Sequence, residues 1–405
     1  MNHLGWTLAP MIAAGLLVPT LGCRDDAQSP TEPQATPALA TASTPLSFLS
    51  VSAGGYHTCG VAVDNRAYCW GLNSDGQLGD GTTVSRSRPT AVATGLRFIQ
   101  LSASHEHTCG VTADSLVYCW GRGQYGRLGN GWIGNRLRPV AVAGGRHFRQ
   151  VNGGAFHTCA VTPTDVAFCW GDNRWGQLGD GTKIGRLTPV MVAGGFRFRR
   201  VSTTGHTCGV TTGKRAYCWG DGDFGKVGDG SGIQRLVPVQ VAGGFSFSQV
   251  NTGNAHTCGL TPDHRIYCWG YNGNGRLGDG TTTNRQTPVA VAGGLSFSQA
   301  EAGVSYSCGV TTGNRAYCWG DNFAGGLGDG TTTDRLRPVA VAGGLLFSRV
   351  SPGGHHACGV TTLKRAYCWG HNAYGQLGTG TSTGPETCGL DIPCSRRPKA
   401  VVGPM

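Results

Sequence analysis

The sequence predicts an all-β fold, a seven-bladed β-propeller, and three observations support this prediction. A Cys-Trp-Gly tripeptide recurs seven times in the 405 residues, at intervals of 50, 50, 49, 50, 50 and 50 residues. Each interval holds four short stretches rich in β-branched and aromatic residues, and four strands in about 50 residues match one propeller blade. Glycine accounts for 69 of the 405 residues, as expected for a chain with many tight turns.

The first repeat illustrates the elements that we expect in every blade. Strands are predicted at 48–51, 57–63, 66–70 and 89–92, with Gly, Asn and Asp clusters between them. One such sheet cannot bury both of its faces, but seven sheets arranged radially can, so the repeated Trp is predicted to pack between blades. The repeats run from Phe48 to Val402. We therefore expect one closed ring, which leaves no free sheet edge.

The first 46 residues differ from the repeats and predict export. Residues 8–21 are almost entirely apolar or small; the stretch is too short to span a membrane, so residues 1–22 are predicted to be a signal peptide. The end of this stretch, Thr20-Leu21-Gly22-Cys23, resembles a bacterial lipobox, which implies lipidation of Cys23; the alternative is simple cleavage and secretion. Residues 23–46 are rich in Pro, Ala and Thr and are predicted to be a flexible tether before a propeller at 47–405.

The net charge of +11 is compatible with acidic partners. The basic residues are spread through the repeats, so we attribute the charge to solubility and predict no nucleic-acid partner. We expect a monomer in the cell envelope, with membrane anchoring through Cys23, or an extracellular monomer.

The seventeen cysteines divide into Cys23, seven repeated pairs and two residues near the C-terminus. A hairpin turn around Asp64-Asn65 would place Cys59 opposite Cys69, close enough for a disulfide. Zinc sites favour cysteines two to four residues apart, and reduced cysteines would be expected in the cytosol. We therefore predict the disulfides Cys59–Cys69, Cys109–Cys119, Cys159–Cys169, Cys208–Cys218, Cys258–Cys268, Cys308–Cys318, Cys358–Cys368 and Cys388–Cys394.

Several motifs resemble chemical sites, but the repeat gives each of them a structural interpretation. G-x-G-x-x-G occurs at 121–126 and 220–225 without the βαβ unit that a dinucleotide site needs, so we predict no cofactor. A repeated His could suggest a metal, but we favour a buried imidazole that holds a turn through hydrogen bonds. The repeated Asp are predicted to bond turn amides rather than to form a calcium loop. The repeated Arg are predicted to form a salt bridge or a stacking contact in each blade rather than a basic annulus. These positions are His57, His107, His157, His206, His256 and His356; Asp80, Asp180, Asp229, Asp279 and Asp329; and Arg86, Arg136, Arg186, Arg235, Arg285 and Arg335.

The repeat resembles that of the regulator-of-chromosome-condensation (RCC1) family. The resemblance covers residues 47–402 and rests on Ser52-Ala53-Gly54, His57-Thr58, Tyr68-Cys69-Trp70-Gly71 and Gly76-Gln77-Leu78-Gly79-Asp80-Gly81. It implies a propeller that acts by binding. A guanine-nucleotide exchange factor is the alternative that it implies. Other propellers suggest a second alternative, an enzyme with a lyase or hydrolase site in the central channel. The sequence contains no non-repeated grouping of His, Asp and Ser, so we predict a binding protein and not an enzyme.

Binding residues are expected where the repeat is broken. The turn after each Trp-Gly varies and is aromatic in six repeats, and large apolar residues replace Thr-Thr at Trp132-Ile133. The last repeat also carries an insert between Gly380 and Pro398. Aromatic residues in loops are typical of binding hot spots. We therefore predict a binding face for a protein or a glycan, formed by Tyr125, Trp132, Trp175, Phe224, Tyr271, Phe323 and Tyr374.

Overall fold

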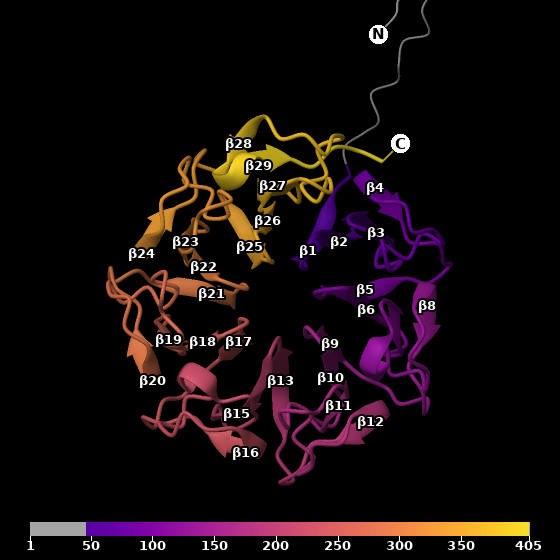
Figure 1. Cartoon of the computed structure of the whole chain (residues 1–405), viewed down its shortest axis with the longest axis vertical. Coiled ribbons are helices and arrows are strands. Elements are labelled where there is room, and N and C mark those ends of the chain that lie inside the picture. The colour runs from indigo at the N-terminus through magenta and orange to yellow at the C-terminus, as the bar shows by residue number, and fades with distance from the viewer. Residues whose placement is uncertain (1–45, 405) are drawn as a thin grey trace, which may run out of the picture. The chain divides into compact units, whose positions relative to one another are not determined.

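The computed structural model describes residues 46–404 and shows seven antiparallel sheets arranged as blades around a central channel (Figure 1). This confirms the predicted seven-bladed propeller. The predicted signal peptide, Cys23 and most of the tether lie outside the described residues. Ser43–Met405 forms one compact unit. Within residues 46–404, no helix has the length and apolar character needed to cross a membrane.

Each blade is a four-stranded meander, and its strands run outward from the channel in sequence order. The first strands are β1 (Phe48–Ala53), β5 (Phe98–Ala103), β9 (Gln150–Gly153), β13 (Phe198–Thr203), β17 (Gln249–Thr252), β21 (Phe297–Ala302) and β25 (Phe347–Pro352). The second strands are β2 (His57–Ala62), β6 (His107–Thr112), β10 (His157–Val161), β14 (His206–Thr211), β18 (His256–Leu260), β22 (Tyr306–Thr311) and β26 (His356–Thr361).

The third strands carry the Cys-Trp-Gly tripeptides: β3 (Ala67–Gly71), β7 (Val117–Gly121), β11 (Ala167–Gly171), β15 (Ala216–Gly220), β19 (Ile266–Gly270), β23 (Ala316–Gly320) and β27 (Ala366–His371). The outer strands are β4 (Arg86–Ala91), β8 (Arg136–Ala141), β12 (Arg186–Met191), β16 (Arg235–Gln240), β20 (Arg285–Ala290), β24 (Arg335–Ala340) and β29 (Ile392–Ala400). The last blade has an extra strand, β28 (Glu386–Cys388), at its edge.

The outer strand of the first blade begins earlier than predicted, at Arg86 rather than at 89. Arg86 pairs with Gly71, and a bulge separates this pair from the next one, between Cys69 and Thr90. The bulge interrupts the alternation of side chains, so the first residues of the strand lack the pattern from which the sequence predicted strands.

The apolar cores lie between neighbouring blades, as the repeat predicted. In one cluster, Cys59 and Leu78 of the first blade pack against Phe98 and Trp120 of the second. The Trp120 indole N–H donates to the Gln77 carbonyl of the first blade at 3.0 Å. Each blade therefore completes the core of its neighbour, and the ring is the folding unit.

Gly79 allows the indole of Trp120 to approach the loop of the preceding blade. Its φ is +70°, and a Cβ at this position would lie 2.6 Å from the indole nitrogen. Both the backbone conformation and the lack of space require glycine here.

The ring closes between the first and last blades through the same kinds of contact. The Phe48 amide donates to the Lys364 carbonyl at 2.9 Å, and the Ala53 amide donates to the Ser351 hydroxyl at 3.0 Å. Trp70 shares an apolar cluster with Leu377. Each blade is built from one continuous stretch of chain, so the ring closes through contacts between blades and not through a shared sheet.

The structure contains all eight disulfides that the spacing predicted. In the first blade Cys59 lies directly opposite Cys69 in the β2–β3 register. The sulfur atoms of the seven repeated pairs lie in the cores between blades, where the cysteines are fully buried. Each repeated disulfide stabilises its hairpin by about 3 kcal/mol in the chain-entropy account.

Candidate functional site

The order of the strands creates two faces with different compositions. In each blade, the turn between the first and second strands and the loop between the third and fourth lie at one end of the sheet. We call this end the loop face. The turn between the second and third strands and the connection to the next blade lie at the other end, which we call the turn face. All the predicted binding residues lie in third-to-fourth-strand loops and therefore belong to the loop face.

Five of the seven predicted binding residues are exposed. The exposed fractions are 37% for Tyr125, 58% for Trp132, 51% for Trp175, 50% for Phe224 and 40% for Tyr374. These fractions leave a large part of each ring free to contact another molecule.

Tyr271 and Phe323 are half-buried, because neighbouring blades and the insert cover them. The Tyr271 ring packs 4.9 Å from that of Phe224, and the Phe323 ring packs 4.9 Å from that of His355. The Phe323 carbonyl also accepts the amide of Gly389, which lies in the insert. Both side chains therefore pack mainly against neighbouring residues and offer less surface to a partner than the five exposed residues do.

The exposed apolar residues of the loop face are concentrated on the second, third and fourth blades. We call this set the aromatic arc: Tyr125, Trp132, Ile133, Phe156, Trp175, Ile184, Phe224 and Ile233. At the position of Ile184, the fifth and sixth blades carry Thr283 and Thr333. Val84 of the first blade is also exposed at this position, but most of the exposed apolar side chains of the loop face lie on three adjacent blades.

Phe156, Ile184 and Ile233 did not appear among the predicted binding residues. The fifth and sixth blades carry small or polar residues at these repeat positions, but the first blade carries Tyr56 and Val84 there, so the signal in the sequence was weak. Phe156 lies in the turn between the first two strands, and only the fold places this turn beside the loop that carries Tyr125. Their rings are 6.0 Å apart, edge to face.

Two aromatic residues of the arc have a backbone conformation that residues other than Gly rarely adopt. Tyr125 has φ 65° and Phe224 has φ 61°. The left-handed region costs such residues roughly 1–2 kcal/mol. Strain of this kind persists where the surrounding structure fixes it, and it is frequent at binding sites.

A buried arginine supports the arc from below. The Arg127 side chain is fully buried; its Nη1 donates to the Ala155 carbonyl at 2.8 Å and to Glu106 Oε2 at 3.2 Å. The guanidinium carbon lies 5.3 Å from the centroid of the Phe156 ring and 5.7 Å from that of Tyr125. Burial lowers the pKa of Arg127, and the Glu106 carboxylate opposes this shift. The cation and its partners hold both rings in place before any partner binds.

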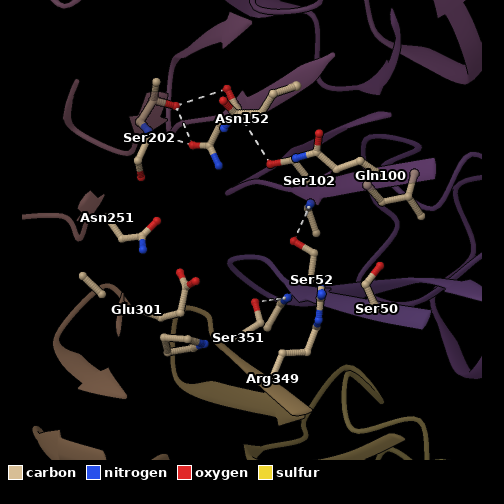
Figure 2. Close-up of a pocket in the computed structure, with 18 of the residues that line it drawn as sticks. Ser50, Ser52, Gln100, Ser102, Asn152, Ser202, Asn251, Glu301, Arg349 and Ser351 are labelled. Atoms are coloured by element: carbon tan, nitrogen blue, oxygen red, sulfur yellow. Dashed lines mark hydrogen bonds between the residues drawn. The ribbon is translucent and has the colours of Figure 1, made fainter. Parts of the chain in front are cut away.

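The central channel is the second candidate site (Figure 2). It contains a cavity of about 310 Å³ at the seven first strands, and its polar lining combines Ser, Gln and Asn side chains with Arg200 and Arg349. Glu301 is the one carboxylate among the residues that line it, and its Oε1 accepts from the amides of Gln299 at 3.0 Å and Gln249 at 3.1 Å. Loss of hydration in the channel raises the pKa of Glu301 to about 7, although these amides and nearby arginines favour the ionised form.

Glu301 breaks a ring of hydrogen bonds between blades. At this repeat position Ser52 accepts the amide of Ala103, and Ser102 accepts that of Gly153, each at 3.0 Å. The residue at the donor position for Glu301 is Pro352, which has no N–H. The carboxylate therefore accepts no backbone amide of the next blade; its contact between blades is the hydrogen bond from the Gln249 side chain of the preceding blade.

The family of the chain follows from its sequence and agrees with this geometry. Residues 17–309 match the RCC1-like domain, and residues 297–325 and 347–376 match the regulator of chromosome condensation (RCC1) repeat. The chain belongs to the RCC1-like family. No curated protein matches it.

Solved structures show the same RCC1-like fold. Human WBSCR16 aligns with a TM-score of 0.72 and 22% identity over 78% of this chain and 88% of that one. Yeast RCC1 (Prp20), solved bound to Kap60, aligns with a TM-score of 0.71 and 18% identity over 95% of this chain and 91% of that one. The ectodomain of the Physcomitrella patens receptor kinase CR4 aligns with a TM-score of 0.52 and 22% identity, over 80% and 74%. At these identities the similarity establishes the fold.

In this RCC1-like propeller the repeated His residues join adjacent blades. His57 Nε2 lies 2.8 Å from Thr108 Oγ1 of the next blade, and Thr108 donates its own proton to the Gln77 carbonyl at 2.8 Å. Because the hydroxyl has one hydrogen, the imidazole must donate through Nε2. Burial lowers the pKa of His57 to about 3. We expected these imidazoles to hold a turn, but they bond to the neighbouring blade.

The other repeated His residues follow the same pattern around the ring. His107, His157, His206 and His256 each reach a Thr or Ser hydroxyl of the next blade. His356 reaches Thr58 and so closes the circuit. Among residues 46–404, no group of three or more His, Cys, Asp or Glu side chains is placed to hold a metal ion.

The repeated Asp and Arg form one ion pair per blade, as predicted, in five blades. Asp80 accepts from the Thr82 amide at 2.9 Å and from Arg86 Nε at 3.0 Å. Equivalent pairs join Asp180 to Arg186, Asp229 to Arg235, Asp279 to Arg285 and Asp329 to Arg335. Arg136 lacks this partner because Asn130 replaces the Asp.

The insert forms an additional strand pair on the last blade. β28 pairs with the start of β29, with Cys388 opposite Ile392, and the Cys388–Cys394 disulfide links the two strands. Arg396 donates to Glu386 at 2.7 Å. The insert therefore covers Phe323 and leaves Leu390 exposed at its tip.

Proposed function

We propose that this chain is an exported, non-catalytic binding protein that docks a protein partner on its aromatic arc. The observation that carries the proposal is the exposure of eight large apolar side chains on three adjacent blades of one face. Contiguous exposed apolar surface of this kind is typical of interaction sites. The buried Arg127 below Tyr125 and Phe156 reduces the entropy lost when a partner binds.

The composition of the arc favours a protein over a glycan. Ile133, Ile184 and Ile233 lie among the aromatic rings, and aliphatic side chains cannot hydrogen-bond to sugar hydroxyls. Aromatic anchors surrounded by other apolar contacts are the usual centre of a protein interface.

Two observations support export. Seven of the eight disulfides have fully buried sulfurs, and structural disulfides form in oxidising compartments. The apolar stretch at 8–21 has the length of a signal-peptide core. Anchoring through a lipid on Cys23 is part of the proposal.

The yeast relatives support a protein partner. Prp20 has been solved in complex with Kap60, and Prp20p has binding properties toward Gsp1p and histones. An exchange factor is the alternative that the family suggests, and it requires a GTPase in the same compartment as this chain.

A propeller enzyme is the second alternative, and Glu301 is the observation that favours it. A carboxyl group with a pKa of about 7 in a polar channel is suited to proton transfer. Glu301→Gln separates the two functions. Binding through the arc does not change in this variant, whereas catalysis in the channel would be lost.

The direct test is capture of a partner by the immobilised unit Ser43–Met405 from envelope and secreted fractions, followed by titration with the purified partner. The test variant is Trp175→Ala with Phe224→Ala. A matched control, Tyr374→Ala with Leu390→Ala, removes exposed apolar side chains from the last blade of the same face.

We expect the test variant to weaken binding by roughly 30-fold or more, since a hot-spot residue contributes about 2 kcal/mol, and the control to bind like the wild type. Equal loss in both variants would refute a site on the arc. Captured material that resists protease but is destroyed by periodate would identify a glycan.

A further inference from the structure

The turn face carries most of the excess positive charge of the described residues. It holds fourteen basic side chains, all of them exposed, against four acidic ones. The basic residues are Arg66, Arg97, Arg146, Arg149, Arg197, Arg199, Arg200, Lys214, Arg215, Arg265, Arg315, Arg349, Lys364 and Arg365. The acidic residues are Asp64, Asp114, Asp165 and Asp263.

The rest of the described chain is nearly balanced, with eighteen basic and fifteen acidic residues. Many of these are already paired, as Asp80 is with Arg86 and Glu106 with Arg127. On the turn face, ion pairs occupy three arginines: Arg66 with Asp64, Arg149 with Asp165 and Arg265 with Asp263. The sequence suggested that the basic residues are spread evenly; the fold instead collects the unpaired ones on one face.

Exposed aliphatic side chains lie beside this charge on the first, second and last blades. Leu363 is 82% exposed at the tip of the β26–β27 turn and is followed by Lys364 and Arg365. Leu346, Leu49, Val63 and Ile99 are exposed on the same face. The turn face therefore combines protruding apolar tips with surrounding cations.

Backbone hydrogen bonds bring these residues together at the seam of the ring. The Thr362 amide donates to the Leu346 carbonyl at 3.0 Å, and the Phe48 amide donates to the Lys364 carbonyl at 2.9 Å. The Val63 amide donates to the Ser47 carbonyl at 3.1 Å. The described chain enters the propeller at this seam, because β1 begins on the turn face.

We propose that the turn face binds the surface of an anionic lipid bilayer. Basic side chains are attracted to anionic headgroups, and aliphatic tips at the seam enter the boundary between headgroups and acyl chains. A nucleic acid would also attract the cations, but it offers no apolar layer for Leu363. In this orientation the loop face, with the aromatic arc, points away from the membrane.

Vesicle co-sedimentation tests this proposal on the unit Ser43–Met405, which contains the complete ring of cores and lacks Cys23. The probes are phosphatidylcholine vesicles with and without phosphatidylglycerol, at low and high salt. We expect binding only with phosphatidylglycerol, weakened by salt. Because Cys23 is absent and the arc lies on the other face, the outcome is independent of lipidation and of the proposed protein partner.

Three variants identify the surface. Lys364→Glu with Arg365→Glu is expected to reduce the partition coefficient by at least 25-fold, from roughly fivefold for each cation removed. Leu363→Ser is expected to reduce it by several-fold, from the loss of apolar burial. Lys183→Glu with Arg337→Glu makes the same change in net charge away from the turn face and is expected to bind as the wild type does.

Equal loss in the two charge-reversal variants would overturn the proposal, because net charge and not the turn face would then govern binding. Absence of binding to phosphatidylglycerol vesicles would also overturn it. Tighter binding to duplex DNA than to vesicles, unaffected by Leu363→Ser, would assign the surface to a nucleic acid.

Discussion

Acidification is expected to unfold this propeller through its ring of buried imidazoles. His57 and His356 have pKa values lowered by burial to about 3, and that of His157 is lowered to about 4. The pKa values of His107, His206 and His256 are also lowered well below 6.5 by burial. In the unfolded chain all six return to about 6.5.

The sign of the effect follows from the protons bound in each state. Near pH 5.5 the unfolded chain holds a proton on nearly every one of the six imidazoles, and the folded chain holds none. Glu301 opposes this by one proton, because its folded pKa of about 7 keeps it protonated when the unfolded carboxyl is ionised. Burial also lowers the pKa of His371 to about 4, which adds one imidazole. Unfolding near pH 5.5 therefore takes up about six protons, and the free energy of unfolding falls there by about 8 kcal/mol per pH unit.

The assay is denaturant unfolding between pH 7.5 and pH 4.5, with the disulfides intact, followed by tryptophan fluorescence. The seven core Trp residues are fully buried, so their emission reports on opening of the ring. A slope that corresponds to fewer than two protons near pH 5.5 would refute the account. It would mean that the imidazoles are charged in the folded ring.

Three further predictions address single contacts. Thr108→Val is expected to lower the free energy of unfolding by about 2–3 kcal/mol in a urea titration, because His57 loses its acceptor in a fully buried site. The control Thr164→Val, at an exposed turn, is expected to change the free energy of unfolding by less than about 0.5 kcal/mol. Equal effects of the two variants would contradict the proposed role of the Thr108 hydroxyl. Glu301→Gln is expected to stabilise the chain above pH 7 and not at pH 4.5, because a raised carboxyl pKa means that folding opposes ionisation of Glu301. Thermal melts of the variant and the wild type at the two pH values test this prediction, and equal shifts of the melting temperature would contradict it. Replacing Cys159 and Cys169 by Ala is expected to lower the free energy of unfolding by about 3 kcal/mol in chemical denaturation. A reductant without denaturant should leave the wild-type disulfides intact, because their sulfurs are buried. Labelling of free thiols measures the reduction, and rapid labelling of the folded chain would contradict the burial of the sulfurs.

Local pattern in the sequence was sufficient for the architecture and the disulfides. The number of blades, their four strands and the packing of Trp between blades follow from a repeat of about 50 residues, because each blade is one continuous meander. The partner of Cys59 is Cys69 because both lie in one hairpin, where register depends on a short turn.

The sequence predicted that the repeated residues form buried contacts, but it did not identify the partner residue in the neighbouring blade. The sequence indicated that the repeated His is buried, but its acceptor lies in the next blade: Thr108 for His57 and Thr58 for His356. The shape of the ring selects these partners. Tyr306 shows this well, since it replaces the His of the sixth blade and reaches the His356 carbonyl instead of a hydroxyl.

The sequence by itself determined the repeat, the ring and the loops in which aromatic residues occur. Only the tertiary structure decided which side chains form a surface together. Phe156 joins Tyr125 in the arc, and Leu363 and Lys364 lie at the seam beside Phe48, because radial packing makes neighbours of residues that are tens or hundreds of positions apart. The same packing separates the charged turn face from the aromatic loop face, because successive connections of a meander lie alternately at the two ends of its strands.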